Sequence, residues 1–393
     1  MRRKKSSITG IPQWPGTAFF LILLVTGHFM QIAHAGELAY AFGYIGEYSD
    51  NIRRTPVAPQ SEWTNSAIVG VAYRENGPLL DAHRVAQAEH RDYKNDTYND
   101  GPLYYADASL LWRISPQRLN WVLVDRYDQI TRDSTLSGTP DNLVNSNVLS
   151  TGPDLFIRLG QVNTLVLEAR YGRASYSEGD VDNNRYGAAV RWLYAANSEM
   201  TYSLNYQADQ VNYENEILND NILRQDSFIR VERRQARARF LLDLGFTRID
   251  RDQAGEASGY LARLSLTQQV TSGSSAGIQF ASEYLDAGTA LLSTATSSTP
   301  IPGVPPSSTA TGELTSDLFY QKRAEAFYTF GGDTLGLNVR VYYRDIDYEI
   351  APQDRQETGG RIEITYNPTS VLATTVYGSH LDIQYQSFTR DDR

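Results

Sequence analysis

Apolar and polar side chains alternate along most of the chain from about residue 37 onward. In one of the cleanest runs, Tyr186, Ala188, Val190, Trp192 and Tyr194 fall at every second position. Because successive side chains of a strand point to opposite faces, such a run predicts a strand with one apolar and one polar face. A soluble antiparallel sheet gives the same alternation, so no single run decides between a membrane barrel and a soluble sheet.

The runs predict seventeen strands. They lie near 38–48, 62–74, 79–93, 104–114, 119–130, 148–159, 164–176, 185–195, 200–213, 226–233, 237–252, 259–270, 275–285, 316–329, 334–348, 355–366 and 371–386. The tenth and eleventh are poorly divided, because Arg230–Phe240 contains no turn signal. Bacterial single-chain barrels have even strand numbers, so either one strand is miscounted or the closing strand is missing here. We favour the second alternative, which predicts a complete barrel of about eighteen strands.

Two kinds of connection alternate between these runs. Tight turns lie at 75–78, 115–118, 160–163, 196–199, 271–274, 331–333 and 367–370. Longer segments lie at 50–61, 94–103, 131–147, 177–184, 214–225, 253–257, 286–315 and 349–354. Short periplasmic turns and longer extracellular loops are typical of outer-membrane barrels. The chain is therefore predicted to be all-β, a transmembrane antiparallel up-and-down β-barrel of about 16–18 strands.

The N-terminus is predicted to be a signal peptide spanning residues 1–35. Arg2–Lys5 forms a charged region, Ala18–Val25 is apolar, and Ala33-His34-Ala35 fits a small-x-small cleavage site. The apolar stretch is shorter than the roughly 20 residues that a membrane anchor needs. We therefore expect a barrel domain over residues 36–393 in the outer membrane, with outer-membrane lipid as its surroundings.

Composition agrees with this interpretation without proving it. The mean hydropathy is −0.43, as expected when only alternate side chains face lipid. The chain has no cysteine and 26 tyrosines, and tyrosine is enriched both in strands and at membrane interfaces. The formal charge is −10, and loss of the four basic residues of the signal peptide makes it −14. This acidic balance argues against nucleic acid as a partner.

The polar faces of the cleaner runs supply candidate lumen residues. They are Glu168, Arg170, Arg191, Asn205, Asp209, Arg263, Glu283, Arg340, Arg344, Arg361 and Glu363. Arginine pairs with carboxylates in a two-point geometry, so ion pairs that hold the barrel together are the simpler expectation for each. The sharper hypothesis is that these side chains contact a saccharide in the lumen.

Signals for catalysis are poor, and we expect neither an enzyme nor a cofactor. After the signal peptide, the histidines are His83, His90 and His380. His83 and His90 are seven residues apart on one predicted strand, so they should face opposite sides, whereas a metal site needs its ligands on one face. No phosphate-binding glycine loop and no metal-ligand cluster is present in the sequence.

The segment Ser293–Gly312 is rich in serine, threonine and proline and lies in a predicted extracellular loop. Such a composition cannot build a core, so disorder is the simpler expectation. A loop folded into the pore as a constriction is the alternative.

Three short motifs carry a family resemblance. Residues 47–52 read Glu-Tyr-Ser-Asp-Asn-Ile, residues 244–251 read Leu-Gly-Phe-Thr-Arg-Ile-Asp-Arg, and His90-Arg91-Asp92-Tyr93 is followed by Asn99-Asp100. An opening tyrosine-rich strand that closes on Tyr-x-Asp-Asn-Ile resembles the outer-membrane β-barrel porins encoded with exopolysaccharide or capsule biosynthesis genes. The departure is at Thr389–Arg393, where the last strand of that family is missing.

The resemblance implies export or surface assembly of exopolysaccharide, with polysaccharide and periplasmic export components as partners. The residues alone imply only a wide, polar-lined barrel. A general or solute-specific diffusion porin, in which the same charges set selectivity, is the first alternative. A structural or adhesive surface barrel that acts through its loops is the second.

Overall fold

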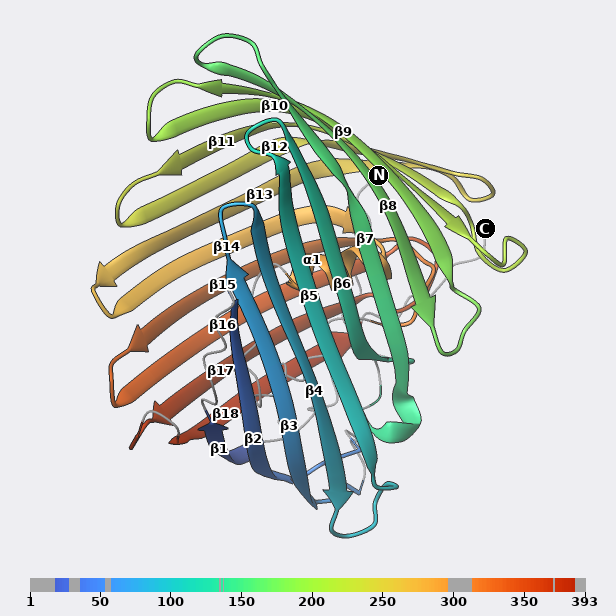
Figure 1. Ribbon diagram of the computed structural model, residues 1–393. Helices are drawn as coiled ribbons and strands as arrows, with labels where there is room; N and C mark the ends of the chain where they lie inside the picture. The colour runs from blue at the N-terminus through green and yellow to red at the C-terminus, as the bar shows by residue number, and fades with distance from the viewer. Residues whose placement is uncertain are drawn as a thin grey trace.

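The computed structural model describes residues 18–27, 36–53, 58–133, 136, 138–295, 313–369 and 372–385. In this part of the chain, 18 strands form one antiparallel sheet in which each strand pairs with its neighbours in sequence. β1 also pairs with β18, so the sheet closes into a barrel (Figure 1). The prediction of an all-β, up-and-down barrel is confirmed.

The strands have the following bounds. They are β1 Ala18–Gly27, β2 Gly36–Ser49, β3 Glu62–Asn76, β4 Leu80–Tyr93, β5 Gly101–Ser115, β6 Leu119–Thr131, β7 Leu143–Arg158, β8 Asn163–Tyr176, β9 Asn183–Ala195, β10 Met200–Tyr213, β11 Ile222–Arg234, β12 Ala238–Arg251, β13 Gly255–Thr271, β14 Ser274–Leu285, β15 Phe319–Gly331, β16 Leu335–Tyr348, β17 Arg355–Tyr366 and β18 Leu372–Tyr385. A 3₁₀ helix η1 spans Pro140–Asn142, and an α-helix α1 spans Ala287–Ala295.

The seventeen strands predicted from alternation correspond one for one to β2–β18. The turn that the sequence did not reveal lies at 235–237, between β11 and β12, where the Gln235 amide donates to the Ala238 carbonyl at 2.8 Å. It contains neither glycine nor proline, so the usual turn signals are absent. Thr389–Arg393 lies outside the described residues.

β1 is formed by the apolar run that was predicted to be the core of the signal peptide. It pairs with β2 over Phe19–Gly27 and with β18 over Ala18–Val25. An extended segment of this length therefore fills the position between β2 and β18, where an eighteenth strand was expected. The charged residues 2–5 and the cleavage site at 33–35 lie outside the described residues, and cleavage remains a prediction.

The outer face of the barrel is apolar and is edged by aromatic side chains. On β9, Tyr186 lies toward one end, Trp192 and Tyr194 lie toward the other, and Val190, 46% exposed, lies between them. Register places the outward positions of β9 opposite those of β10, so Tyr206 faces the same side as Val190. Two aromatic belts around an apolar band are typical of membrane barrels. Among the described residues, no helix is both long and apolar enough to cross a membrane.

The segment between β14 and β15 folds into the barrel instead of extending outward. α1 lies inside the ring of strands (Figure 1), and Leu291 packs with Ile130, Val144, Val148 and Ala174 of the opposite wall. The described ends of 286–315 therefore fold inward from the long-loop end of the barrel, and buried apolar contacts hold them in the lumen. Residues 296–312, which include most of the serine- and proline-rich segment, lie outside the described part of the chain.

Candidate functional site in the lumen

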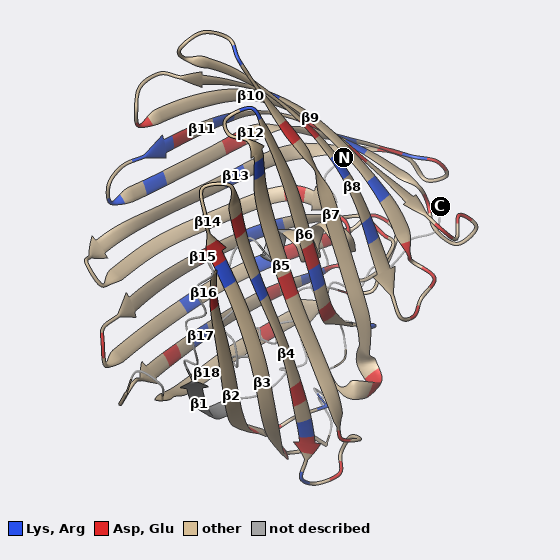
Figure 2. Cartoon of the chain, viewed as in Figure 1, with Lys and Arg blue, Asp and Glu red and all other residues tan. Residues whose placement is uncertain are grey.

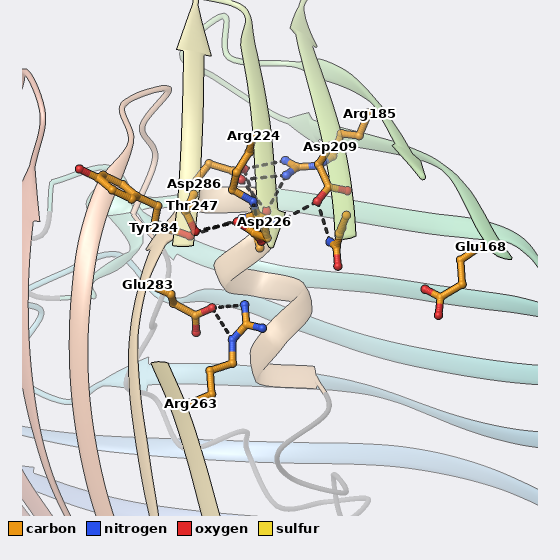
Figure 3. Close-up of polar contacts among 12 residues, drawn as sticks. Glu168, Arg185, Asp209, Arg224, Asp226, Thr247, Arg263, Glu283, Tyr284 and Asp286 are labelled. Carbon is orange, nitrogen blue, oxygen red and sulfur yellow. Dashed lines mark hydrogen bonds and ion pairs between the residues drawn. The ribbon is translucent and has the colours of Figure 1, made fainter. Parts of the chain in front are cut away.

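Asp286 anchors the beginning of the inward-folded segment. Its carboxylate accepts two hydrogen bonds from Arg185 of β9, at 2.6 and 2.8 Å, and one from the Thr289 hydroxyl at 2.5 Å. The same carboxylate accepts the backbone amides of Gly288 at 3.1 Å and Thr289 at 3.3 Å, which caps the first turn of α1. One side chain therefore both starts the helix and fixes it to the wall (Figure 3).

The electrostatics of this anchor favour the charged carboxylate. Burial raises the pKa of Asp286, but the Arg185 guanidinium and the Thr289 hydroxyl outweigh burial and hold the pKa below its usual range. The amino end of a helix also favours a negative charge. Asp286 is therefore ionised throughout the physiological pH range.

The rest of α1 is held by β6 and β7. Arg126 of β6 donates to the Leu291 carbonyl at 3.4 Å and to Asp128 at 2.9 Å. In the strand order β6 is eight positions from β14, close to half of the 18-stranded ring. The segment therefore crosses the lumen from one wall to the other.

The end of the segment that leads into β15 is also fixed to the wall. Glu313 accepts hydrogen bonds from Tyr348 at 2.8 Å and from Arg355 at 2.9 Å. Leu314 donates its amide to the Thr131 carbonyl of β6 at 2.9 Å. Both described ends therefore touch β6, and together they narrow the lumen near the extracellular end of the strands.

A cavity of about 250 Å³ lies beneath α1 against the wall formed by β7 to β11. Its charged lining consists of Arg170, Arg185, Arg191, Arg224, Glu168 and Asp209, and Thr289 and Leu292 of α1 cover it. The hollow exists partly because residue 187 is glycine: a Cβ there would lie 2.7 Å from an Asp209 carboxylate oxygen. This cavity is the candidate functional site.

Inside the cavity each guanidinium has a carboxylate partner. Arg191 binds Glu168 at 2.6 and 3.0 Å, and Arg224 binds Asp209 at 3.0 Å. Arg170 binds Asp154, just outside the lining, at 2.5 Å. The pairs hold these charged side chains in fixed positions around the cavity, and such a charged lining suits solutes with polar and charged groups.

The structure places all eleven candidate lumen residues on the inner face. Their register partners and polar contacts lie on the same side: Glu168 with Arg191, Arg170 with Asp154, Asn205 with Phe228, Asp209 with Arg224, Arg263 with Glu283, Arg340 with Glu325, Arg344 with Glu357, and Arg361 with Glu363. Only Glu168, Arg170, Arg191 and Asp209 line the cavity. The other seven lie elsewhere on the wall in structural contacts, and a saccharide-binding role stays a prediction for all eleven.

Sequence reasoning missed the residues that build the constriction. Arg185 stood on a recognised polar face, but nothing local linked it to Asp286, which follows it by 101 residues. A weak signal was available: Asp286 precedes Ala-Gly-Thr-Ala-Leu-Leu, and an aspartate before such a run is a helix-start signal.

The described residues show no grouping of three or more His, Cys, Asp or Glu side chains that could hold a metal ion. His83 and His90 occupy odd and even positions of β4, so they face opposite sides of the wall.

A closed antiparallel barrel with an apolar outer face, a charged inner face and an inward-folded loop defines an outer-membrane β-barrel. No family model matches the chain, and no curated protein matches it. The association with exopolysaccharide genes inferred from the three short motifs therefore remains a prediction.

Among solved structures, the chain is similar to the outer membrane protein OpdK of Pseudomonas aeruginosa, with 11% identity and a TM-score of 0.40 over 95% of this chain and 100% of that chain. It is also similar to OccAB4 of Acinetobacter baumannii, with 10% identity and a TM-score of 0.37 over 95% and 100%. For the FrpB iron transporter of Neisseria meningitidis the values are 9% and 0.40 over 95% and 62%. Similarity at this level carries no information about the solute.

Proposed function

We propose that this protein is an outer-membrane channel for the diffusion of small polar or charged solutes, and that the segment between β14 and β15 restricts the solutes that pass. The observation that carries the proposal is the attachment of this segment to the far wall, through the Leu291 side chain of α1 and through the Leu314 amide. A barrel of about 16–18 strands otherwise leaves an aqueous lumen.

The cavity beneath α1 supports passage of small solutes. Its volume of about 250 Å³ is slightly below the range of roughly 300–1,000 Å³ that is usual for small-molecule sites. Arg170 and Arg191 can donate to carboxylate or hydroxyl oxygens, and Glu168 can accept from hydroxyl or ammonium groups. The charges that define this cavity would set which solutes enter, as rings of charged side chains do in other pores.

Export of exopolysaccharide is favoured by the motif resemblance alone. A polymer needs a continuous path wide enough for a sugar chain, whereas the segment that crosses this lumen is held at both of its described ends. We therefore place the diffusion channel first and treat export as the competing outcome of the test.

Liposome swelling with the purified full chain tests the proposal. Uncharged sugars and amino acids of increasing size would be compared, and small solutes should enter at a rate that falls steeply with size. In parallel, a deletion strain should keep normal surface and secreted polysaccharide but take up the permeant solutes more slowly. Vesicles that admit no small solute, together with a deletion strain that loses polysaccharide, would favour export over diffusion.

A further inference from the structure

Arginines crowd the periplasmic end of two neighbouring strands. Arg233, Arg234, Arg237 and Arg239 lie within seven residues at the end of β11, the turn at 235–237 and the start of β12. Figure 2 shows these blue segments at the short-turn ends of β11 and β12. The whole chain carries a formal charge of −10, so this cluster runs against the overall balance. Adjacent strand residues point to opposite faces, so Arg233 lies on the outer face and Arg234 on the inner one. We call Arg234, Arg237 and Arg239 the basic mouth.

The carboxylates near the basic mouth are too few to neutralise it. Glu232 accepts from both Arg234, at 2.7 Å, and Arg239, at 3.1 Å. Glu199 lies 3.6 Å from Arg233. Glu199 therefore serves the outward-facing Arg233, and Glu232 alone serves the two guanidiniums of Arg234 and Arg239.

Arg237 is the third guanidinium of the basic mouth. Within the described ranges it has no ion pair and no side-chain hydrogen bond, and only its carbonyl is used, by the Gln269 amide at 2.7 Å. Its side chain is free to bind a solute. The basic mouth thus has two positive charges in excess of its carboxylates, unlike the cavity beneath α1, where guanidiniums and carboxylates are paired.

A cavity of about 590 Å³ opens beside these arginines. Arg234, Arg237 and Arg239 line it together with the polar side chains of Thr267, Gln269 and Ser275. Register pairs Arg234 with Arg239, and Arg239 with Thr267, on the inner face of the barrel. The cavity is therefore at the periplasmic entrance of the lumen, and it is separate from the cavity beneath α1.

The basic mouth is also accessible. The side chains of Arg234 and Arg239 are 67% and 62% exposed. A solute that reaches the lumen from the periplasm would meet these guanidiniums first. Guanidinium groups bind carboxylates through two parallel hydrogen bonds, and the hydroxyl and amide groups around them match the hydroxyls of a sugar or hydroxy acid.

We propose that the basic mouth is a binding site for hydroxylated solutes that carry two or more carboxylates. The excess of two guanidiniums neutralises two negative charges, and Thr267, Gln269 and Ser275 bind hydroxyl groups of the same solute. Such carboxylates occur both in small polycarboxylates and in acidic sugar chains, so the test uses one probe of each kind. The proposal concerns binding and does not depend on whether the barrel conducts small solutes.

Isothermal titration of the full chain in detergent micelles tests the site, with citrate, trigalacturonate and neutral maltotriose as probes. Replacing Arg237 with glutamine (Arg237→Gln) should weaken binding of the anionic probes by about tenfold, and the double change Arg237→Gln with Arg239→Gln should remove it. Added salt should weaken binding, because the exposed guanidiniums are screened. Tighter binding of trigalacturonate than of citrate would identify an acidic sugar chain as the ligand; the reverse would identify a small polycarboxylate.

Two control variants locate the site. Arg248→Gln changes an exposed arginine at the other end of β12, which pairs with Asp250 and Glu256, and it should leave binding unchanged. Arg191→Gln changes the cavity beneath α1. If Arg191→Gln abolishes citrate binding while Arg237→Gln does not, or if maltotriose binds as tightly as trigalacturonate, the proposal is overturned. A heat-induced shift in gel mobility shows that each variant is folded.

Discussion

Arg185 and Asp286 are 101 residues apart in the chain, and their side chains meet in the lumen in a two-point ion pair at 2.6 and 2.8 Å. Arg185 lies on β9, a strand of the barrel wall, whereas Asp286 directly precedes α1, which lies inside the barrel. Both side chains are largely buried, at 13% and 6% exposure. The pair therefore fixes the start of α1 to the wall of the barrel, inside the lumen.

Neutralising either member of this pair should release α1. Removing one partner of a buried ion pair costs about 3–5 kcal/mol, because the remaining charge is left without compensation. We expect Arg185→Gln or Asp286→Asn to raise single-channel conductance in planar bilayers and to admit larger sugars into liposomes. The double variant should do no more than the stronger single variant, because both changes break the same contact.

The control for this prediction is Arg132→Gln. Arg132 pairs with Glu178 beyond the ends of β6 and β8, and their side chains are 48% and 51% exposed. Exposed pairs contribute only about 0–1 kcal/mol, so conductance should not change. Equal conductance in wild type and Asp286→Asn would show that α1 does not limit flow.

The constriction should also withstand mild acid. Since the folded-state pKa of Asp286 lies below its ordinary value, the pair stabilises the docked loop above the ordinary aspartate pKa of about 3.9 and loses that contribution only as pH falls through the lower folded value. We therefore expect the difference in conductance between wild type and Asp286→Asn to persist from pH 7 to about pH 4. Loss of that difference near pH 5–6 would contradict the assignment.

The barrel could be predicted from local information, whereas the constriction could not. Alternation along β9 is enough to assign Val190 to the lipid face and Arg191 to the lumen face, because successive side chains of a strand point to opposite faces. Docking of Leu291 against Val144 and Val148 depends on contacts across the barrel, and no local pattern encodes such contacts. The turn at 235–237 was missed for another reason: two adjacent strands can be joined by residues without special turn chemistry when the sheet itself fixes their register.

Two adjacent residues of β9 test the assignment of lipid and lumen faces. Val190→Arg places a charge in the apolar band and should destabilise the inserted barrel by about 2–4 kcal/mol near the midplane. Arg191→Leu removes a partner of Glu168 from a face that polar groups and water can still solvate, so the barrel should fold and insert. Urea unfolding from lipid vesicles compares the two, and a larger loss for Arg191→Leu would mean that the register is displaced by one residue.

The orientation of the barrel can be tested with cysteine, because the chain contains none. Leu218, 68% exposed, lies in the long connection between β10 and β11, whereas Ser198 lies in the short turn between β9 and β10. If long loops are extracellular and short turns periplasmic, a membrane-impermeant maleimide should label Leu218→Cys on intact cells. It should label Ser198→Cys only after the outer membrane is permeabilised. If only Ser198→Cys were labelled on intact cells, the orientation of the barrel would be the reverse of the one assumed here. The basic mouth would then face the outside of the cell.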